Sequence, residues 1–295
     1  MPKSLRRLSE RNPFLSVLYN LPRLAKGYQP IYLDYPVNPV PRYGYGKPLH
    51  PELSGILASG SADYVRLLTD FLKFESNLLA IPVRQPKTSE EPCWVNKWLG
   101  GLDTFALYGF VAACNPAVYI EVGSGFSTKV VRRAIRDLSL STRLVSIDPS
   151  PRAEIDRLCD EVIRQPLEDC DLSVFDCLGP GDIFFMDGSH RSFMNSDVTV
   201  FFLEILPRFK PEVFVHIHDI YLPFDYPPDR AYWYYSEQYL LAASLLAGHQ
   251  GYDIVLPNNY ISNTPEISRV LESFWACPQL SGVTRDGCSF WLRTR

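Results

Sequence analysis

The chain lacks the features that mark membrane and nucleic-acid-binding proteins. Its 295 residues contain no uninterrupted apolar run of about 18 residues, the length that a membrane-spanning helix needs. Neither sign of charge predominates, because 29 Lys and Arg face 33 Asp and Glu, and the formal net charge is −4. A protein that binds nucleic acid by neutralising phosphates is usually basic. We therefore expect neither a nucleic acid nor a membrane as partner.

The N-terminus also lacks the apolar core of a secretory signal. Its apolar stretch, Phe14 to Leu21, is interrupted by Ser16 and Asn20 and stopped by Pro22. The seven cysteines are odd in number and scattered, with no C-x-x-C pair. Together these features predict a cytoplasmic protein.

Residues 1–51 differ in composition from the rest of the chain, because seven prolines fall between residues 22 and 51 among many tyrosines. Proline fixes the backbone and removes a hydrogen-bond donor, so no regular element can run through this segment. The tyrosines still need a surface to cover. We expect an irregular arm that lies on the main domain or on a partner subunit, which would make the protein a homo-oligomer. A helix from Ser61 should follow, and we expect an N-terminal extension of 1–95 and a main domain of 96–295.

The main domain alternates short apolar strands with helical segments, a pattern typical of a parallel sheet covered by helices. The fold class is therefore α/β, with seven strands in a mostly parallel sheet and helices on both faces. Helices are expected at 103–114, 127–138, 198–206, 230–247 and 265–275. Strands are expected at 117–122, 143–147, 161–164, 182–186, 213–217, 252–256 and 289–293.

Polar residues gather where four of these strands end. They are Glu121 with a glycine loop, Asp148, Asp187 with His190, and His218 with Asp219. In open sheets of this kind, ligands bind beyond the carboxyl ends of the strands. Turn residues and helix caps alone would account for the glycines, but not for four acids and two histidines. The pattern predicts a ligand site at this edge of the sheet.

The glycine loop favours S-adenosylmethionine over a nicotinamide dinucleotide. Gly123 and Gly125 follow a strand, but the G-x-G-x-x-G fingerprint would need a third glycine where Thr128 stands. The Glu121 carboxylate would repel a pyrophosphate and attract a sulfonium or ammonium group. Asp148, 23 residues past Gly125, is placed to accept both ribose hydroxyls. A nicotinamide oxidoreductase is thus disfavoured.

Four motifs carry a family resemblance: Y-I-E-V-G-S-G-F-S-T from 119, S-I-D-P-S-P from 146, F-M-D-G-S-H from 185 and V-H-I-H-D-I from 215. Residues 100–295 resemble a class I S-adenosylmethionine-dependent methyltransferase with a Rossmann-like fold, of the bacterial group near macrocin-type and other sugar O-methyltransferases. Ser127 replaces the usual third glycine. The resemblance implies a set of cofactor-binding residues: Glu121, Gly123, Ser124 and Gly125 at the methionine part, Asp148 at the ribose, Gln165 and Leu167 at the adenine, and Asp187.

The same resemblance suggests the catalytic residues. His190 is the best candidate for a general base, because imidazole titrates near neutrality. In metal-dependent sugar and catechol O-methyltransferases, acids after the fourth and fifth strands bind a divalent ion, and Asp187, His218 and Asp219 occupy those places here. The alternative is a metal-free polar site in which these groups act as a base or as hydrogen-bond partners.

An aromatic segment follows the fifth strand, with eight aromatic residues between 221 and 239. Such faces suit sugar rings or phenols, and they also suit a packed lid or a subunit contact. The leading hypothesis is O-methylation of a small polyhydroxylated acceptor or glycan. The alternatives are N-methylation of a small molecule, and a non-catalytic protein of this fold that binds a partner through its arm.

Overall fold

The computed structural model describes residues 21–22, 25, 31, 33–84, 90–151, 154–248 and 251–295. The chain forms two compact units, Met1–Pro39 and Val40–Arg295. The boundary that we expected between residues 95 and 96 does not coincide with this division. Much of the expected arm lies outside the described residues, and the account below concerns the second unit.

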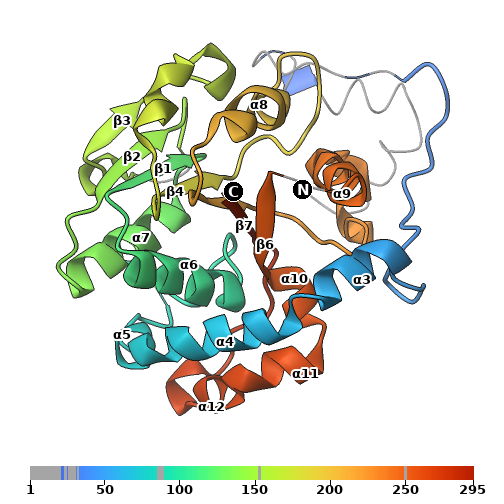
Figure 1. Cartoon of the computed structure of the whole chain (residues 1–295). Coiled ribbons are helices and arrows are strands. Elements are labelled where there is room, and N and C mark those ends of the chain that lie inside the picture. Colours follow the sequence, from blue (N-terminus) through green and yellow to red (C-terminus); the bar gives the residue numbers. More distant parts are fainter. Residues whose placement is uncertain are drawn as a thin grey trace. The chain divides into compact units, whose positions relative to one another are not determined.

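The second unit is built on one sheet of seven strands in the order β3-β2-β1-β4-β5-β7-β6 (Figure 1). Neighbours from β3 to β5 are parallel, and β7 runs antiparallel to both β5 and β6. The seven predicted strands are confirmed to within one or two residues. They are β1 Val118–Val122, β2 Arg143–Ile147, β3 Glu161–Ile163, β4 Ile183–Met186, β5 Phe214–Ile217, β6 Tyr252–Pro257 and β7 Phe290–Thr294.

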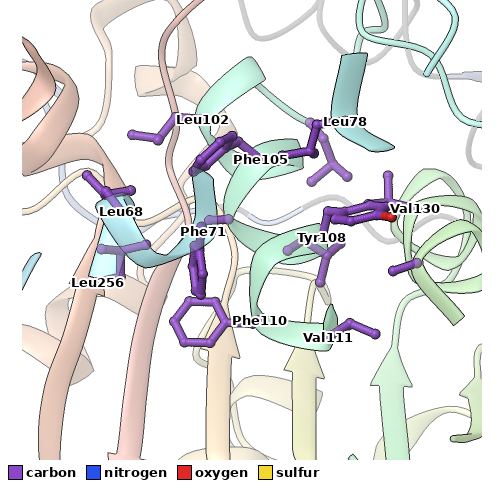
Figure 2. Close-up of a cluster of buried hydrophobic side chains, with 14 of the residues drawn as sticks. Leu68, Phe71, Leu78, Leu102, Phe105, Tyr108, Phe110, Val111, Val130 and Leu256 are labelled. Atoms are coloured by element: carbon purple, nitrogen blue, oxygen red, sulfur yellow. The ribbon is translucent and has the colours of Figure 1, made fainter. Parts of the chain in front are cut away.

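Helices cover both faces of the sheet, because the central strands are apolar on both sides. On one face, Tyr119 and Phe185 pack with α4 (Ser61–Phe71), α6 (Gly101–Cys114) and α7 (Phe126–Asp137). Figure 2 shows this core, in which the Phe71 ring of α4 meets the Phe110 ring of α6 at 5.1 Å between centroids. On the other face, Ile120 and Phe184 pack with residues of α3, α8 and α9: Pro51–Ala58, Asp197–Val200 and Glu237–Leu246.

The helices predicted at 103–114 and 127–138 are confirmed as α6 and α7 to within two residues, whereas the helix predicted at 230–247 is wrong. The segment 230–247 is not one helix, because Tyr234 takes a left-handed conformation with φ 54°. A 3₁₀ turn, Pro228–Trp233, precedes this break, and α9 begins only at Glu237. The helix expected at 198–206 is α8 followed by a π turn, Phe201–Ile205.

Shorter helical segments complete the unit. The segment expected at 265–275 consists of α11 (Pro265–Ser268) and α12 (Glu272–Trp275), joined by a 3₁₀ turn, Arg269–Leu271. The remaining α-helices are α5 Glu75–Leu79 and α10 Asn258–Ser262; the other 3₁₀ turns are Leu72–Phe74, Asp156–Leu158, Leu167–Asp169, Leu172–Cys177, Leu206–Arg208 and Pro278–Leu280. No helix in the described ranges is both long and apolar enough to cross a bilayer.

The last residues of the expected arm belong to the second unit and lie on its aromatic segment. The backbone amide of Tyr43 donates to the Asp225 carboxylate at 3.0 Å, and that of His50 donates to the Pro223 carbonyl at 3.4 Å. A side chain at Gly44, where φ is +75°, would overlap the Phe224 ring. Residues 40–50 therefore cover the main domain, as expected of this part of the arm.

Candidate functional site

A cavity of about 470 Å³ opens at the carboxyl ends of β1, β2 and β4. This is the edge of the sheet where the polar residues were predicted to gather. Of the predicted site residues, those that line the cavity are Gly123, Ser124, Gly125, Asp148, Leu167 and Asp187. The residues not anticipated include Trp98, Leu99, Phe126, Lys129, Glu168, Ser189, Ser196 and Asp197.

The glycine loop forms one wall of the cavity because its backbone passes close to the end of β4. Gly123 has φ +80°, and a Cβ there would lie 1.9 Å from the Asp187 carbonyl oxygen. Only glycine satisfies both conditions. The loop then enters α7, where the Gly125 amide donates to Thr128 Oγ1 at 3.0 Å. Thr128, which replaces the third glycine of the dinucleotide fingerprint, thus fixes the loop.

Asp148 closes the same wall from the end of β2. Its Oδ2 accepts the Ser124 amide at 2.8 Å, and its Oδ1 accepts the Ser150 amide at 2.7 Å. These two bonds orient the carboxylate while it still lines the cavity. A carboxylate fixed in this way can accept hydrogen bonds from a diol, which agrees with the predicted role of Asp148 at a ribose.

Two predicted cofactor residues do not line the cavity. Glu121 is completely buried and accepts from the hydroxyl of Ser127 at 3.0 Å and from that of Thr128. Burial raises the pKa of Glu121 to about 8, although those hydroxyls oppose the shift. Its carboxyl group therefore supports the glycine loop from behind. Gln165 is exposed and does not line the cavity, whereas the next two residues, Pro166 and Leu167, do.

His190 lies among three carboxyl groups and is itself only 5% exposed. Its Nδ1 is 2.9 Å from Glu237 Oε2, and its Nε2 is 3.1 Å from Asp187 Oδ1 and 3.7 Å from Asp219 Oδ2. Burial disfavours the charged ring, but Asp187 and Glu237 outweigh it and hold the pKa of His190 well above its ordinary value. A protonated ring with both nitrogens engaged cannot accept a proton. The structure therefore argues against His190 as the general base.

Asp219, at the end of β5, faces Arg230 rather than the cavity. Its Oδ1 accepts from Arg230 Nη1 at 2.5 Å and from Tyr221 Oη at 3.1 Å. Burial would raise the pKa of Asp219, but His218, His190 and Arg230 lower it well below its usual range. Asp219 is thus held as a carboxylate by Arg230 and His190, and it does not line the cavity.

The predicted metal ligands Asp187, His218 and Asp219 do not converge on one ion. The His190 ring stands between the two carboxylates, and His218 Nε2 lies 3.2 Å from the Trp98 carbonyl oxygen. Within the described ranges, the ligand atoms that come within 4.8 Å of one another belong to a different group: Asp103, His218 and Cys288. The sequence could not predict that His190 separates the two carboxylates. The His190 backbone is in the left-handed region, with φ +60°, and its ring lies between Asp187 and Asp219.

The Asp103 group has a structural explanation. Asp103 Oδ1 accepts the backbone amide of Ser289 at 2.9 Å and the side-chain amide of Asn258 at 2.8 Å, and its Oδ2 accepts the Cys288 amide at 2.9 Å. These bonds tie the start of α6 to the strand β7. His216 is likewise structural, because it stacks on Phe185 at 4.0 Å between ring centroids and forms a hydrogen bond with the Ser289 hydroxyl.

Several of the unanticipated lining residues lie at the starts of α6 and α8. Trp98 and Leu99 precede α6, which leads into β1 and must therefore begin at the sheet's opposite, carboxyl edge. That argument was available from the sequence. Asp197 starts α8, and its carboxylate accepts the Ser189 amide at 2.6 Å, which holds the loop after β4. No motif pointed to this contact.

Comparisons with known proteins found one matching family model and several similar solved structures. A family model described as a methyltransferase domain matches residues 120–220. No curated protein matches the chain. Similar solved structures include the SAH-bound methyltransferase PaMTH1 of Podospora anserina, which is 14% identical over 85% of this chain and 99% of its own, with a TM-score of 0.42.

Two further solved structures are similar. The O-methyltransferase TomG of Streptomyces achromogenes, in complex with SAM, is 15% identical over 82% of this chain and 95% of its own, with a TM-score of 0.37. An O-methyltransferase from Bacillus cereus, in complex with SAH, is 14% identical over 78% and 90%, with a TM-score of 0.34. The matched residues 120–220 run from β1 past β5 and include the glycine loop, Asp148 and Asp187, so the chain has the predicted Rossmann-like methyltransferase fold with a region similar to a methyltransferase domain.

Proposed function

We propose that this protein is an S-adenosylmethionine-dependent methyltransferase. The observation that carries the proposal is the pairing of the glycine loop with Asp148 in one cavity wall. Gly123 and Gly125 line the cavity without side chains and so leave room for the amino-acid part of the cofactor, and Asp148 presents a carboxylate to a ribose diol. Leu167 adds an apolar surface beside them for the adenine.

The chemistry of the lining also supports this cofactor over a dinucleotide. Asp148, Asp187 and Glu168 line the cavity, and Lys129 is the basic residue among the lining residues. This acidic lining would repel a pyrophosphate and is compatible with a sulfonium. When bound, S-adenosylmethionine would supply the methyl group from its positively charged sulfonium, which becomes a neutral thioether after the transfer.

We further propose that the acceptor is a hydroxyl group of a small polyhydroxylated molecule or glycan. Asp187 lies where the glycine loop meets the end of β4, so its carboxylate can accept a hydrogen bond from an acceptor hydroxyl and receive that proton as the oxygen takes the methyl group and S-adenosylhomocysteine leaves. Burial would raise the pKa of Asp187, but the nearby His218 and His190 lower it, which keeps the group ionised. Holding the acceptor oxygen in line can supply several kcal/mol of the barrier reduction.

N-methylation is the second candidate, because the same carboxylate could accept a hydrogen bond from the N–H of a neutral amine and take its proton as the nitrogen is methylated. Both candidate functions use the same cofactor, so only the identity of the methylated acceptor can distinguish them. The test begins with calorimetry of S-adenosylhomocysteine and NAD⁺ binding, in which only the former should bind. A panel of sugars, phenols and amines is then assayed with labelled S-adenosylmethionine. Binding of NAD⁺ and not of S-adenosylhomocysteine would contradict the proposal.

A further inference from the structure

The ends of β4 and β5 are linked by a side chain of the protein itself. His190 Nε2 is 3.1 Å from Asp187 Oδ1, after β4, and 3.7 Å from Asp219 Oδ2, after β5. The same ring reaches Glu237 Oε2 at 2.9 Å through Nδ1. One imidazole therefore occupies the space that a cation shared by the two strand-end carboxylates would need.

The contacts of this ring favour its doubly protonated form. An ionised carboxylate only accepts hydrogen bonds and a neutral imidazole has only one N–H, so two ionised partners on the two ring nitrogens require two N–H groups. Glu237 has no exposed surface and comes from α9, 47 residues away in the chain. Burial raises the pKa of Glu237, whereas the hydrogen bond and the charge of His190 oppose that shift and favour the carboxylate as counter-ion of the ring.

The surrounding backbone holds the ring in place. The His190 carbonyl accepts the amides of Ser236 at 2.8 Å and Glu237 at 3.3 Å, at the start of α9. The Ser192 amide in turn donates to Ser236 Oγ at 2.9 Å. The Tyr235 ring lies against the imidazole at 4.5 Å between centroids. The loop after β4 and the start of α9 thus form one unit.

We infer that Glu237 and His190 are positioning residues that hold Asp187 toward the acceptor, with the imidazolium in place of a divalent ion between the two strand ends. Asp187 touches the acceptor, and Glu237 acts only through His190. The reaction is then independent of added metal. This inference rests on the proposed function for its kinetic consequences, whereas the bridge itself is testable in the protein without substrate.

The first experiment observes the bridge directly. Full-length ¹⁵N-labelled protein is studied by imidazole ¹H–¹⁵N correlation spectra at neutral pH, and the His190 signals are assigned by their loss in His190→Gln. We expect both ring nitrogens of His190 to be protonated, and addition of Mn²⁺ to leave these signals sharp. A neutral His190, or one Mn²⁺ ion bound so that His190 signals broaden, would overturn the inference whether or not the acceptor is known.

The second experiment measures positioning. Glu237→Gln keeps the size and an acceptor oxygen but removes the charge, so kcat should fall about tenfold or more while KM for S-adenosylmethionine changes little. Glu237→Asp should recover part of kcat. Asp182→Asn is the matched control, since Asp182 is a buried acid at the opposite end of β4 that accepts the Val118 amide and does not line the cavity.

Three kinetic results would count against the inference. They are unchanged kcat in Glu237→Gln, an equal loss of kcat in Asp182→Asn, and loss of wild-type activity with a chelator followed by recovery with a divalent ion. If the wild type binds S-adenosylhomocysteine but methylates no acceptor, the proposed function fails at the acceptor, and the ¹⁵N spectra still decide the bridge.

Discussion

The backbone amide of Ser124 donates a 2.8 Å hydrogen bond to Asp148 Oδ2, which ties the loop after β1 to the end of β2. The Gly123 amide extends the same link by donating to the Ile147 carbonyl at 3.0 Å. Asp148 therefore has two functions in the proposed site. It shapes the glycine loop, and it presents its remaining acceptor positions to the cavity.

We predict that Asp148→Ala weakens binding of S-adenosylmethionine by roughly 2–4 kcal/mol, because hydrogen bonds to a charged acceptor are the strong ones. Asp148→Asn should lose less, because it keeps one acceptor oxygen for the Ser124 amide. Calorimetry on the folded variants measures both, and Asp169→Ala, an exposed acid outside the lining, is the control. Unchanged affinity in Asp148→Ala would remove the ribose role.

Asp187→Ala should abolish turnover but spare the cofactor. The side chain lines the cavity and pairs with His190, whereas the glycine loop packs against the Asp187 backbone, which the substitution retains. We expect kcat to fall by about 10²-fold or more and the affinity for S-adenosylhomocysteine to change by less than about threefold. An assay with the identified acceptor, paired with calorimetry, checks this. Turnover at the wild-type rate would place the acceptor elsewhere.

The strands β1, β2, β4 and β5 were predictable because each is a short, largely apolar run that is followed by glycine, aspartate or histidine. Such a run buries both faces in a parallel sheet, so its limits follow from the residues alone. Once the end of each strand is predicted, the residues that begin the loops at the carboxyl edge of the sheet are predicted as well. This is why Gly123, Asp148 and Asp187 line the cavity as predicted.

The direction of individual side chains was not predictable, because distant residues set it. Glu121 turns toward the hydroxyls of Ser127 and Thr128 instead of the cavity. His190 turns toward Glu237, which no local pattern connects with it. The break at Tyr234 also has a tertiary cause, since the Trp233 carbonyl accepts from Arg191 Nε at 3.0 Å where the expected helix would need it internally.

Arg230 should stabilise the aromatic segment through Asp219. The guanidinium bonds the Asp219 carboxylate and lies 5.3 Å from the ring centroids of both Tyr221 and Trp233. Arg230→Ala leaves a buried carboxylate without its cation, and we expect a loss of about 1–3 kcal/mol in the free energy of unfolding.

Urea unfolding measures this loss, and limited proteolysis should show faster cleavage within 228–236. Arg285→Ala is the matched control, because Arg285 pairs with Glu272 at the surface and should change stability by about 0.5 kcal/mol or less. Equal losses in the two arginine variants would show that the Asp219 pair has no special weight.

The buried Glu121 gives the protein a pH-dependent stability. Its pKa is raised by burial from 4.5 to about 8 in the folded chain. Below the lower value the carboxyl group is protonated in both states and costs nothing. Between the two values the unfolded chain releases its proton while the folded chain retains it, so the unfolded state is favoured progressively as pH rises. The loss levels off near pH 8 and amounts to roughly a few kcal/mol.

Glu121→Gln removes this titration and keeps an oxygen that can accept from Ser127 and Thr128. The variant should therefore gain stability relative to the wild type as pH rises from 5 to about 8, the range set by the raised pKa. Urea unfolding at several pH values, without ligand, measures the difference, and Glu266→Gln at an exposed position is the control. A difference that stays constant across this range would mean that Glu121 ionises alike in both states, and its burial behind the glycine loop would then carry no such cost.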